Sequence, residues 1–155
     1  MEQVEKLKYL KHDAIYLLKK LSGDEVPDWG LMNVQQMIEH LSDSVRIANG
    51  KDPHSLITPA ENLEKLQAFM LSDKEFRPNT PNSLLPKAPA PVKLANIAAA
   101  IKELEQEISD FELFFSDDHS KIQMNPFFGP LTFEQWTHLF HKHFRHHLRQ
   151  FKLIA

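Results

Sequence analysis

The sequence predicts an all-α protein of the four-helix-bundle class, and three observations lead to this prediction. Four segments repeat apolar residues at steps of three and four positions, which is the period of an amphipathic helix. No segment shows the regular apolar–polar alternation of a half-buried strand. A long proline-rich stretch separates the second of the four segments from the third, so the expected bundle contains one long crossover connection.

The first two expected helices lie in the N-terminal third of the chain. The first runs from Val4 to Leu21, and Ser22-Gly23 marks its end. The second begins after Asn33, which together with Gln36 has the spacing of a capping box, and Asn49-Gly50 is its stop signal. Its inward-facing stripe consists of Val34, Met37, Leu41, Ser44 and Ala48.

A short extra helix and the crossover are expected next. The run from Thr58 to Glu61 combines a cap, a proline at the first helical position and a capping glutamate, which predicts a helix ending near Met70. Five of the ten prolines then fall between Pro78 and Pro91, a density that excludes a helix interior or a central strand. We expect an extended crossover, with packing residues at Leu84, Leu85 and Val92.

The third and fourth long helices complete the expected bundle. The fourth begins at Thr132, with Gln135 in the capping-box position, and continues toward the C-terminus. The third has the most regular stripe, with alternating steps of three and four: Leu94, Ile97, Ile101, Leu104, Ile108, Phe111 and Phe115.

Composition sets the class of protein. A chain of 155 residues with 42% hydrophobic residues and eleven phenylalanines is expected to form one globular domain, residues 1–155. The absence of cysteine excludes disulfides, thiol nucleophiles and cysteine-based metal sites. A net charge of −3 argues against nucleic acid as a partner. Without a long apolar run or a signal-peptide pattern, we expect a cytoplasmic protein with no membrane contact.

Histidine is unusually frequent, with nine residues in total and five between His138 and His147. On a helical wheel with 100° per residue, His143 and His147 lie within about 20° of Trp136, in the middle of the apolar face of the fourth helix. His40 faces inward from the second helix. The opposite, solvent-facing side of the fourth helix is expected to hold His138, His141, Lys142, Arg145, Arg149 and Lys152.

Three inward-facing imidazoles from two helices point to a metal site. Two histidines four residues apart on one helix can bind the same ion, and a third leaves coordination positions open, as in catalytic rather than structural zinc sites. Imidazole nitrogens suit zinc, nickel, copper or iron. The competing interpretation is three ordinary core histidines that are hydrogen-bonded within the protein. His138 and His141, in contrast, are expected to titrate near the ordinary pKa of about 6.5.

Two segments carry a resemblance to a known superfamily. "MIEHL" at Met37–Leu41 and "HFRHHLRQF" at His143–Phe151, with "FGPLT" at Phe128–Thr132 and Trp136, resemble the DinB-like superfamily, and a branch of uncharacterised proteins within it in particular. The resemblance extends over nearly the whole chain. Related chains often have His-Pro before the FG turn, whereas this one has Asn125-Pro126, so no ligand is expected from the turn.

The resemblance implies an up-down-down-up bundle that holds a divalent metal, commonly zinc or nickel, through His40, His143 and His147. Iron and manganese are further candidates. It also implies a homodimer and metal-dependent thiol transfer, isomerisation or hydrolysis, with a small-molecule substrate and a low-molecular-weight thiol as a candidate co-substrate.

Two hypotheses follow for function. The first is a metal-dependent enzyme, in which the ion activates water, a thiolate or a carbonyl. No catalytic side chain is assigned. Residues expected to line its pocket or to orient its ligands are Met37, Asp43, Ser44, Trp136, Phe140 and Gln150. The second hypothesis is a non-catalytic helical interaction module with a structural or vestigial metal site, whose basic last helix would meet an anionic partner. Phe127, Phe128 and Phe144 are candidates for a dimer surface.

Overall fold

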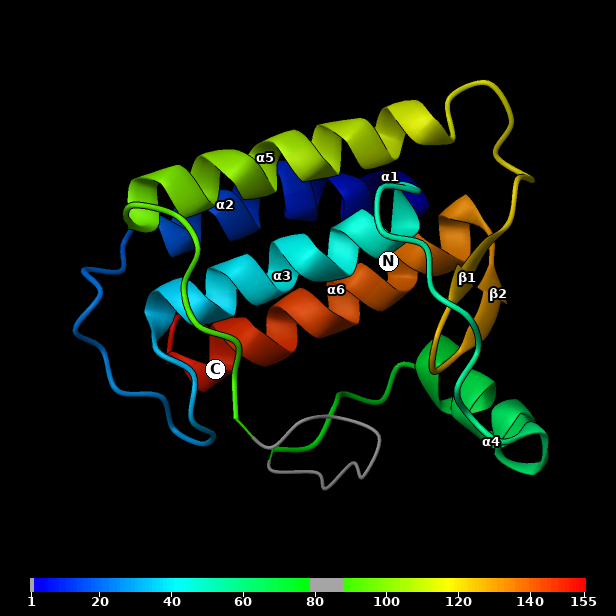
Figure 1. Cartoon of the computed structure of the whole chain (residues 1–155), viewed down its shortest axis with the longest axis horizontal. Helices are drawn as coiled ribbons and strands as arrows, with labels where there is room; N and C mark the ends of the chain where they lie inside the picture. Colours follow the sequence, from blue (N-terminus) through cyan, green and yellow to red (C-terminus); the bar gives the residue numbers. More distant parts are fainter. Residues whose placement is uncertain (1, 79–87) are drawn as a thin grey trace.

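The computed structural model of the chain describes residues 2–78 and 88–155. This part of the protein is mostly helical, as predicted, and also contains a small sheet (Figure 1). The elements in chain order are α1 (Gln3–Lys8), η1 (Tyr9–Asp13), α2 (Ala14–Leu18), α3 (Val34–Ala48), α4 (Ala60–Leu71), α5 (Ile97–Phe114), β1 (Gln123–Asn125), β2 (Gly129–Leu131) and α6 (Phe133–Gln150).

The N-terminal helix differs from the prediction in one respect. It is interrupted by η1, a π-helical segment, and ends at Leu18 rather than Leu21. A π segment adds residues to one turn and so rotates the preceding residues around the helix axis relative to the following ones. Leu10, Ala14 and Leu18 accordingly form a buried stripe, whereas Val4 is 77% exposed and does not belong to it.

The caps predicted for the second and last long helices are confirmed. The Asn33 side chain accepts a hydrogen bond from the Gln36 backbone, and the Gln36 side chain accepts one from Asn33. Thr132 and Gln135 form the same reciprocal pair at the start of α6. These bonds satisfy backbone N–H groups that a helix start leaves free, so both boundaries are readable from sequence.

The short helix α4 begins one residue later than predicted, at Ala60. Pro59 is its N-cap without a side-chain hydrogen bond, so the expected cap by Thr58 is wrong. The Thr58 hydroxyl instead donates to the Phe127 carbonyl at 2.8 Å. Thr58, predicted to cap the helix, therefore links the start of α4 to the β1–β2 turn.

The two-stranded sheet is absent from the sequence-based prediction. Strands β1 and β2 pair antiparallel, with Gln123 opposite Leu131 and Asn125 opposite Gly129. The Asn125 side chain accepts from the backbone N–H groups of Phe127 and Phe128, and Gly129 has φ +85°, which favours glycine. Strands of three residues are too short to show an alternating pattern.

The crossover lies partly outside the described residues, and so do Leu84 and Leu85. Its described C-terminal end is fastened to α3 by hydrogen bonds. The backbone N–H groups of Lys93 and Leu94 donate to the Glu39 carboxylate, and Gln35 Nε2 donates to the Leu94 carbonyl at 2.8 Å.

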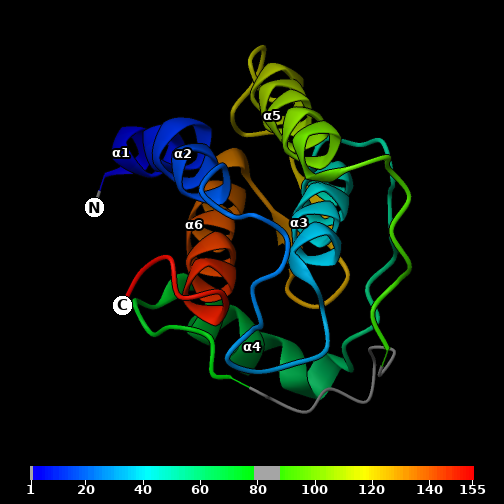
Figure 2. The same ribbon diagram turned by 90° about the vertical axis from the view of Figure 1, so that its left-hand side faces the viewer.

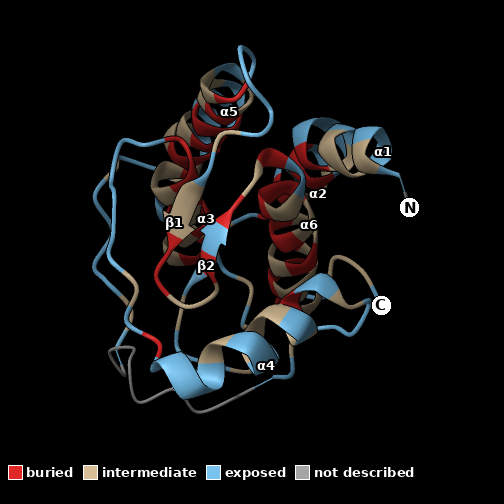
Figure 3. Ribbon diagram, turned by 90° about the vertical axis from the view of Figure 1, so that its right-hand side faces the viewer, coloured by how far each residue is buried: buried red, intermediate tan, exposed pale blue. Residues whose placement is uncertain are grey.

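The helices enclose one apolar core. Helix α3 packs along α5, and α6 contacts α1, α2 and α3. Viewed from the end, α4 lies across one side of these helices (Figure 2). The buried faces of α3, α5 and α6 turn toward one another, whereas α4 is largely exposed (Figure 3). None of the helices within the described ranges is long and apolar enough to cross a membrane.

Candidate metal centre

Three histidines converge between α3 and α6. His40 Nε2 lies 3.0 Å from His143 Nε2, and His147 Nε2 lies 3.1 Å from the same atom. One nitrogen from each ring falls within 4.8 Å of the other two. The three residues selected from the helical wheels are thus close enough to hold one metal ion. His147 is buried, whereas His40 and His143 are partly accessible to solvent.

Burial keeps these imidazoles neutral near pH 7. Loss of solvation lowers the pKa of His40 to about 4, with a smaller contribution from the nearby His146. Burial, and then the proximity of the other rings, also holds the pKa values of His143 and His147 well below the ordinary value. Neutral imidazole is the form that binds a metal, so the ligands need not lose protons at neutral pH.

Gln150 fixes the tautomer of His147. Gln150 Nε2 donates to the Trp29 carbonyl at 2.9 Å, and Gln150 Oε1 lies 2.7 Å from His147 Nδ1. Because a carbonyl only accepts, the amide oxygen must face the ring, and His147 Nδ1 carries the proton. The lone pair of His147 therefore lies on Nε2, toward the other two histidines. This is the arrangement by which a polar neighbour orients a metal-binding histidine.

The donor atoms fit a cation. The ring nitrogen of a neutral imidazole either carries a hydrogen or offers a lone pair, and it cannot do both. His143 Nε2 faces two nitrogens at hydrogen-bond distance, one of which, on His147, offers a lone pair. Neutral rings therefore cannot form a good hydrogen bond in both contacts. A single ion that accepts a lone pair from each ring resolves this conflict, and three nitrogens within 4.8 Å of one another are near enough to be its ligands.

Aromatic side chains from two loops lie beside the centre. The Phe76 ring contacts His143 and His146 at centroid distances of 6.3 and 5.9 Å. Trp29 contacts His146 at 5.2 Å. Sequence reasoning missed both aromatic residues, because each lies in an irregular segment where no periodicity shows which way a side chain points.

The other predicted site residues take different positions. Gln150 bonds a ligand, as described above. The Ser44 hydroxyl donates to the main-chain carbonyl of His40 at 3.0 Å, not to its ring, and Asp43 is exposed. The three residues expected to frame a pocket are buried in the apolar core: Met37, Trp136 and Phe140. Trp136 Nε1 donates to the Gln123 carbonyl, which ties α6 to β1.

The solvent-facing side predicted for α6 needs correction. Lys142 is only 7% exposed, and its Nζ donates to the Phe69 carbonyl at the end of α4. His138 and His141 are half-buried, and burial lowers the pKa of both, that of His141 to about 4. The helical wheel could not show that α1 and the segment after α4 cover this side.

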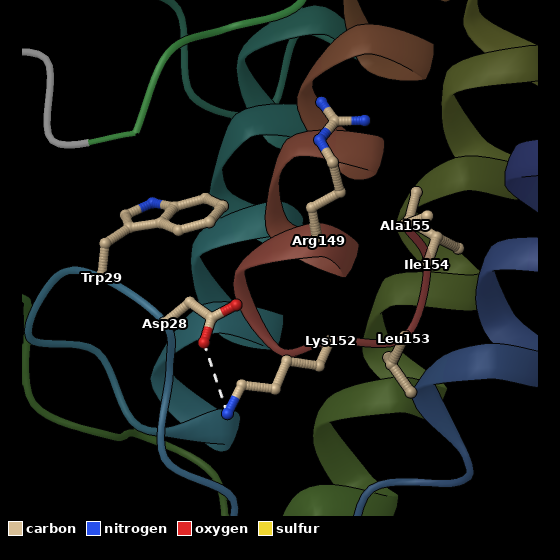
Figure 4. A pocket seen from close by; sticks show the side chains of 7 residues that line it. All are labelled: Asp28, Trp29, Arg149, Lys152, Leu153, Ile154 and Ala155. Atoms are coloured by element: carbon tan, nitrogen blue, oxygen red, sulfur yellow. Dashed lines mark ion pairs between the residues drawn. The ribbon is translucent and has the colours of Figure 1, made fainter.

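A cavity of about 510 Å³ opens at the C-terminal end of α6 (Figure 4). Asp28 and Lys152 form an ion pair of 3.3 Å at its edge, and Trp29 and Arg149 line its walls. None of the three clustered histidines is among its lining residues. Two residues that line the cavity also hold Gln150, which orients His147. The Gln150 side chain donates to the Trp29 carbonyl, and the Asp28 backbone N–H donates to the Gln150 carbonyl.

Comparison with known proteins identifies the family. A search of curated proteins and a search of solved structures gave no significant match. The family model described as "Protein of unknown function (DUF1569)" matches residues 1–153, nearly the whole chain. This match agrees with the resemblance seen in the histidine segments. The chain therefore belongs to DUF1569, a DinB-like family.

Proposed function

We propose that this protein is a metal-dependent enzyme in which His40, His143 and His147 hold one divalent transition metal. The observation that supports this proposal is the convergence of three neutral imidazole nitrogens within 4.8 Å of one another. Three protein ligands leave positions open for substrate, as in catalytic sites. Imidazole ligands suit several first-row metals; the resemblance to the DinB-like superfamily favours zinc or nickel, and iron and manganese are further candidates.

When bound, such an ion would supply Lewis acidity for thiol transfer, isomerisation or hydrolysis of a small molecule. The chain's own residues prepare the centre. Gln150 keeps the His147 lone pair directed at the cluster, and burial keeps the rings unprotonated. Phe76 and Trp29 offer apolar surface beside the accessible side of the centre, which suits the organic part of a small substrate such as a low-molecular-weight thiol.

We also propose the up-down-down-up bundle for the four long helical segments, and a homodimer as the assembly. Phe144 is fully buried and cannot contribute to a dimer surface, so Phe127 and Phe128, which are half-buried, are the remaining candidates from the sequence. Light scattering at tens of micromolar tests the dimer, and a purely monomeric mass would contradict it.

Elemental analysis tests the proposed function. The untagged protein is purified without chelator or nickel resin, beside a variant with His40→Ala, His143→Ala and His147→Ala. We expect a near-stoichiometric transition metal in the first protein and none in the second. Thiol-transfer and hydrolase screens of the metal-loaded protein then identify the reaction. A folded protein that neither contains nor takes up zinc, nickel, iron or manganese would contradict the proposal and favour a helical interaction module.

A further inference from the structure

A second polar cavity lies on the opposite side of α6 from the three clustered histidines. We call it the basic cavity. It has a volume of about 120 Å³ and lies between α1, the segment after α4 and α6. Five lysines and arginines but only two acidic residues line it, in a chain whose net charge is −3. The cationic lining residues are Lys6, Lys74, Lys142, Arg145 and Arg149.

The convergence of positive charge is not explained by helix α6 alone. Basic residues in the last turn of a helix complement its dipole, which accounts for Arg149. It does not account for Lys6, on α1, or Lys74, after α4, which face the same cavity from other segments. Burial lowers the pKa values of Lys142 and His141; the nearby Asp73 partly opposes this for Lys142, whereas Arg145 and Lys6 lower the pKa of His141 further. With five cationic and two acidic residues, the lining is short of negative charge.

Two residues that line the cavity each carry a buried hydrogen-bonding atom without a partner. Among the described residues, nothing bonds His141 Nε2 or Arg149 Nη2. Leaving a buried polar group unpaired is unfavourable, so such atoms call for an explanation. Glu75 supplies part of the missing negative charge. Arg149 Nη1 donates to Glu75 Oε1 at 2.9 Å, and Arg145 Nη2 lies 3.7 Å from the same oxygen.

We propose that the basic cavity binds a small oxyanion, either an inorganic one such as phosphate or the carboxylate of a small organic acid. Its volume of about 120 Å³ corresponds to roughly four water molecules, which suits one tetrahedral oxyanion and excludes a nucleotide. An oxyanion offers acceptors to arginine and lysine donors, and such charge-assisted hydrogen bonds are strong. In this interpretation the exposed Glu75 carboxylate competes with the anion for Arg145 and Arg149.

Calorimetric titration of the full chain tests the proposal. The titrants are phosphate, sulfate and acetate, with chloride as the control at matched ionic strength. We expect saturable binding of phosphate or acetate and none of chloride. A preference for phosphate indicates the inorganic source, and a preference for acetate the organic acid. Binding that is equal for all four anions would reflect diffuse screening and overturn the proposal.

Paired variants with opposite expected signs locate the site. Arg145→Gln removes a cation from the cavity and should weaken binding about tenfold, whereas Lys152→Gln, beyond the end of the same helix, should leave it unchanged. Glu75→Gln removes the competing carboxylate and should strengthen binding severalfold, whereas Glu112→Gln, in an exposed pair on α5, should not. If a variant and its control changed anion affinity equally, the assignment of the anion to the basic cavity would be wrong.

The metal centre must be excluded as the place of binding, because phosphate and carboxylates also bind metal ions. Titration of a His40→Ala variant separates the two sites, since His40 lies on α3 and does not line the basic cavity. We expect unchanged anion binding in this variant. Loss of binding in His40→Ala, with no effect of Arg145→Gln, would assign the anion to the metal centre and contradict the proposal.

Discussion

Helix α3 contributes to two polar clusters that differ in how their hydrogen-bonding groups are satisfied. Toward its C-terminal end, the carboxylate of Glu107, 2% exposed, accepts from Arg46 and Asn49, and also from Lys51, just after the helix. Lys51 additionally bonds Asp110. Two turns earlier, His40 meets His143 and His147 through nitrogen atoms that cannot all be paired.

The two clusters differ in whether the protein's own residues pair every polar group. In the Glu107 cluster each acceptor has a donor and each charge a partner, so the protein completes it with its own residues. In the histidine cluster the three nitrogens cannot all be paired with one another, and no other described residue is hydrogen-bonded to these three atoms. Both clusters are polar groups within a helical protein, but only the second brings together three nitrogens that could hold a metal ion.

The strongest test of this contrast is His143→Ala, because His143 Nε2 faces both other nitrogens. We expect metal affinity to fall by more than about 100-fold, since loss of a ligand exceeds the 10- to 100-fold loss that follows removal of a residue behind one. Competition with a chromophoric chelator measures it. His138→Ala, on the same helix but outside the cluster, should keep its metal. Equal metal binding in both variants would show that His143 is not a ligand.

Glu107→Gln tests the other cluster. We expect the free energy of unfolding to fall by about 2 kcal/mol, because Arg46 and Lys51 lose a charged, buried acceptor. The loss stays moderate since their side chains are 36% and 38% exposed and can turn to water. Urea denaturation measures the change, with Glu105→Gln in an exposed α5 pair as the control. Metal content should remain unchanged; its loss would mean that the two clusters are coupled.

Gln150→Met refines the assignment of roles at the metal centre. The variant removes the acceptor of His147 Nδ1 while approximately keeping side-chain volume. We expect metal affinity to fall about tenfold, as for other residues that orient a ligand. Gln67→Met is the matched control, because Gln67 also donates to a backbone carbonyl, that of Phe128, but does not contact the centre. An unchanged affinity in Gln150→Met would confine Gln150 to a structural role.

The sequence was sufficient for the elements in which local chemistry and periodicity agree. Capping pairs and regular stripes predicted α3, α5 and α6 to within a few residues, and the helical wheels selected the three histidines that meet. A helix face that is both apolar and rich in histidine is unusual because burying an unpaired imidazole is costly. Because of that cost, inward-facing histidines could be identified as a candidate site from the sequence.

The remaining features depend on contacts between distant segments. Lys142 is buried against the end of α4, where its Nζ donates to the carbonyl of Phe69, 73 residues earlier in the chain. Phe76 and Trp29 reach the histidines from irregular loops, and the π segment in the first helix has no signature in its apolar spacing. A helical wheel treats each helix as if it were alone and straight, so it cannot predict which side another segment will cover.

The smallest expected effect is that of Asp110→Asn at the edge of the Glu107 cluster. The hydrogen bond from Lys51 holds the pKa of Asp110 below its ordinary value of 3.8. The ionised carboxylate therefore stabilises the folded state above that ordinary value, and this contribution is lost as the pH falls through the lowered pKa. We expect a loss of less than about 1 kcal/mol at pH 7, because the pair is partly exposed.

Urea denaturation of wild type and Asp110→Asn at pH 7 and at pH 2 separates charge from packing. If the Lys51 pair acts through charge, the difference in unfolding free energy is present at pH 7 and shrinks in acid as the Asp110 carboxylate takes up a proton. A difference that persists in acid would mean that Asp110 acts through its shape, and that the Glu107 cluster is closed by packing rather than by paired charges. The two clusters would then no longer differ in charge pairing, but only in whether they offer a site for a metal ion.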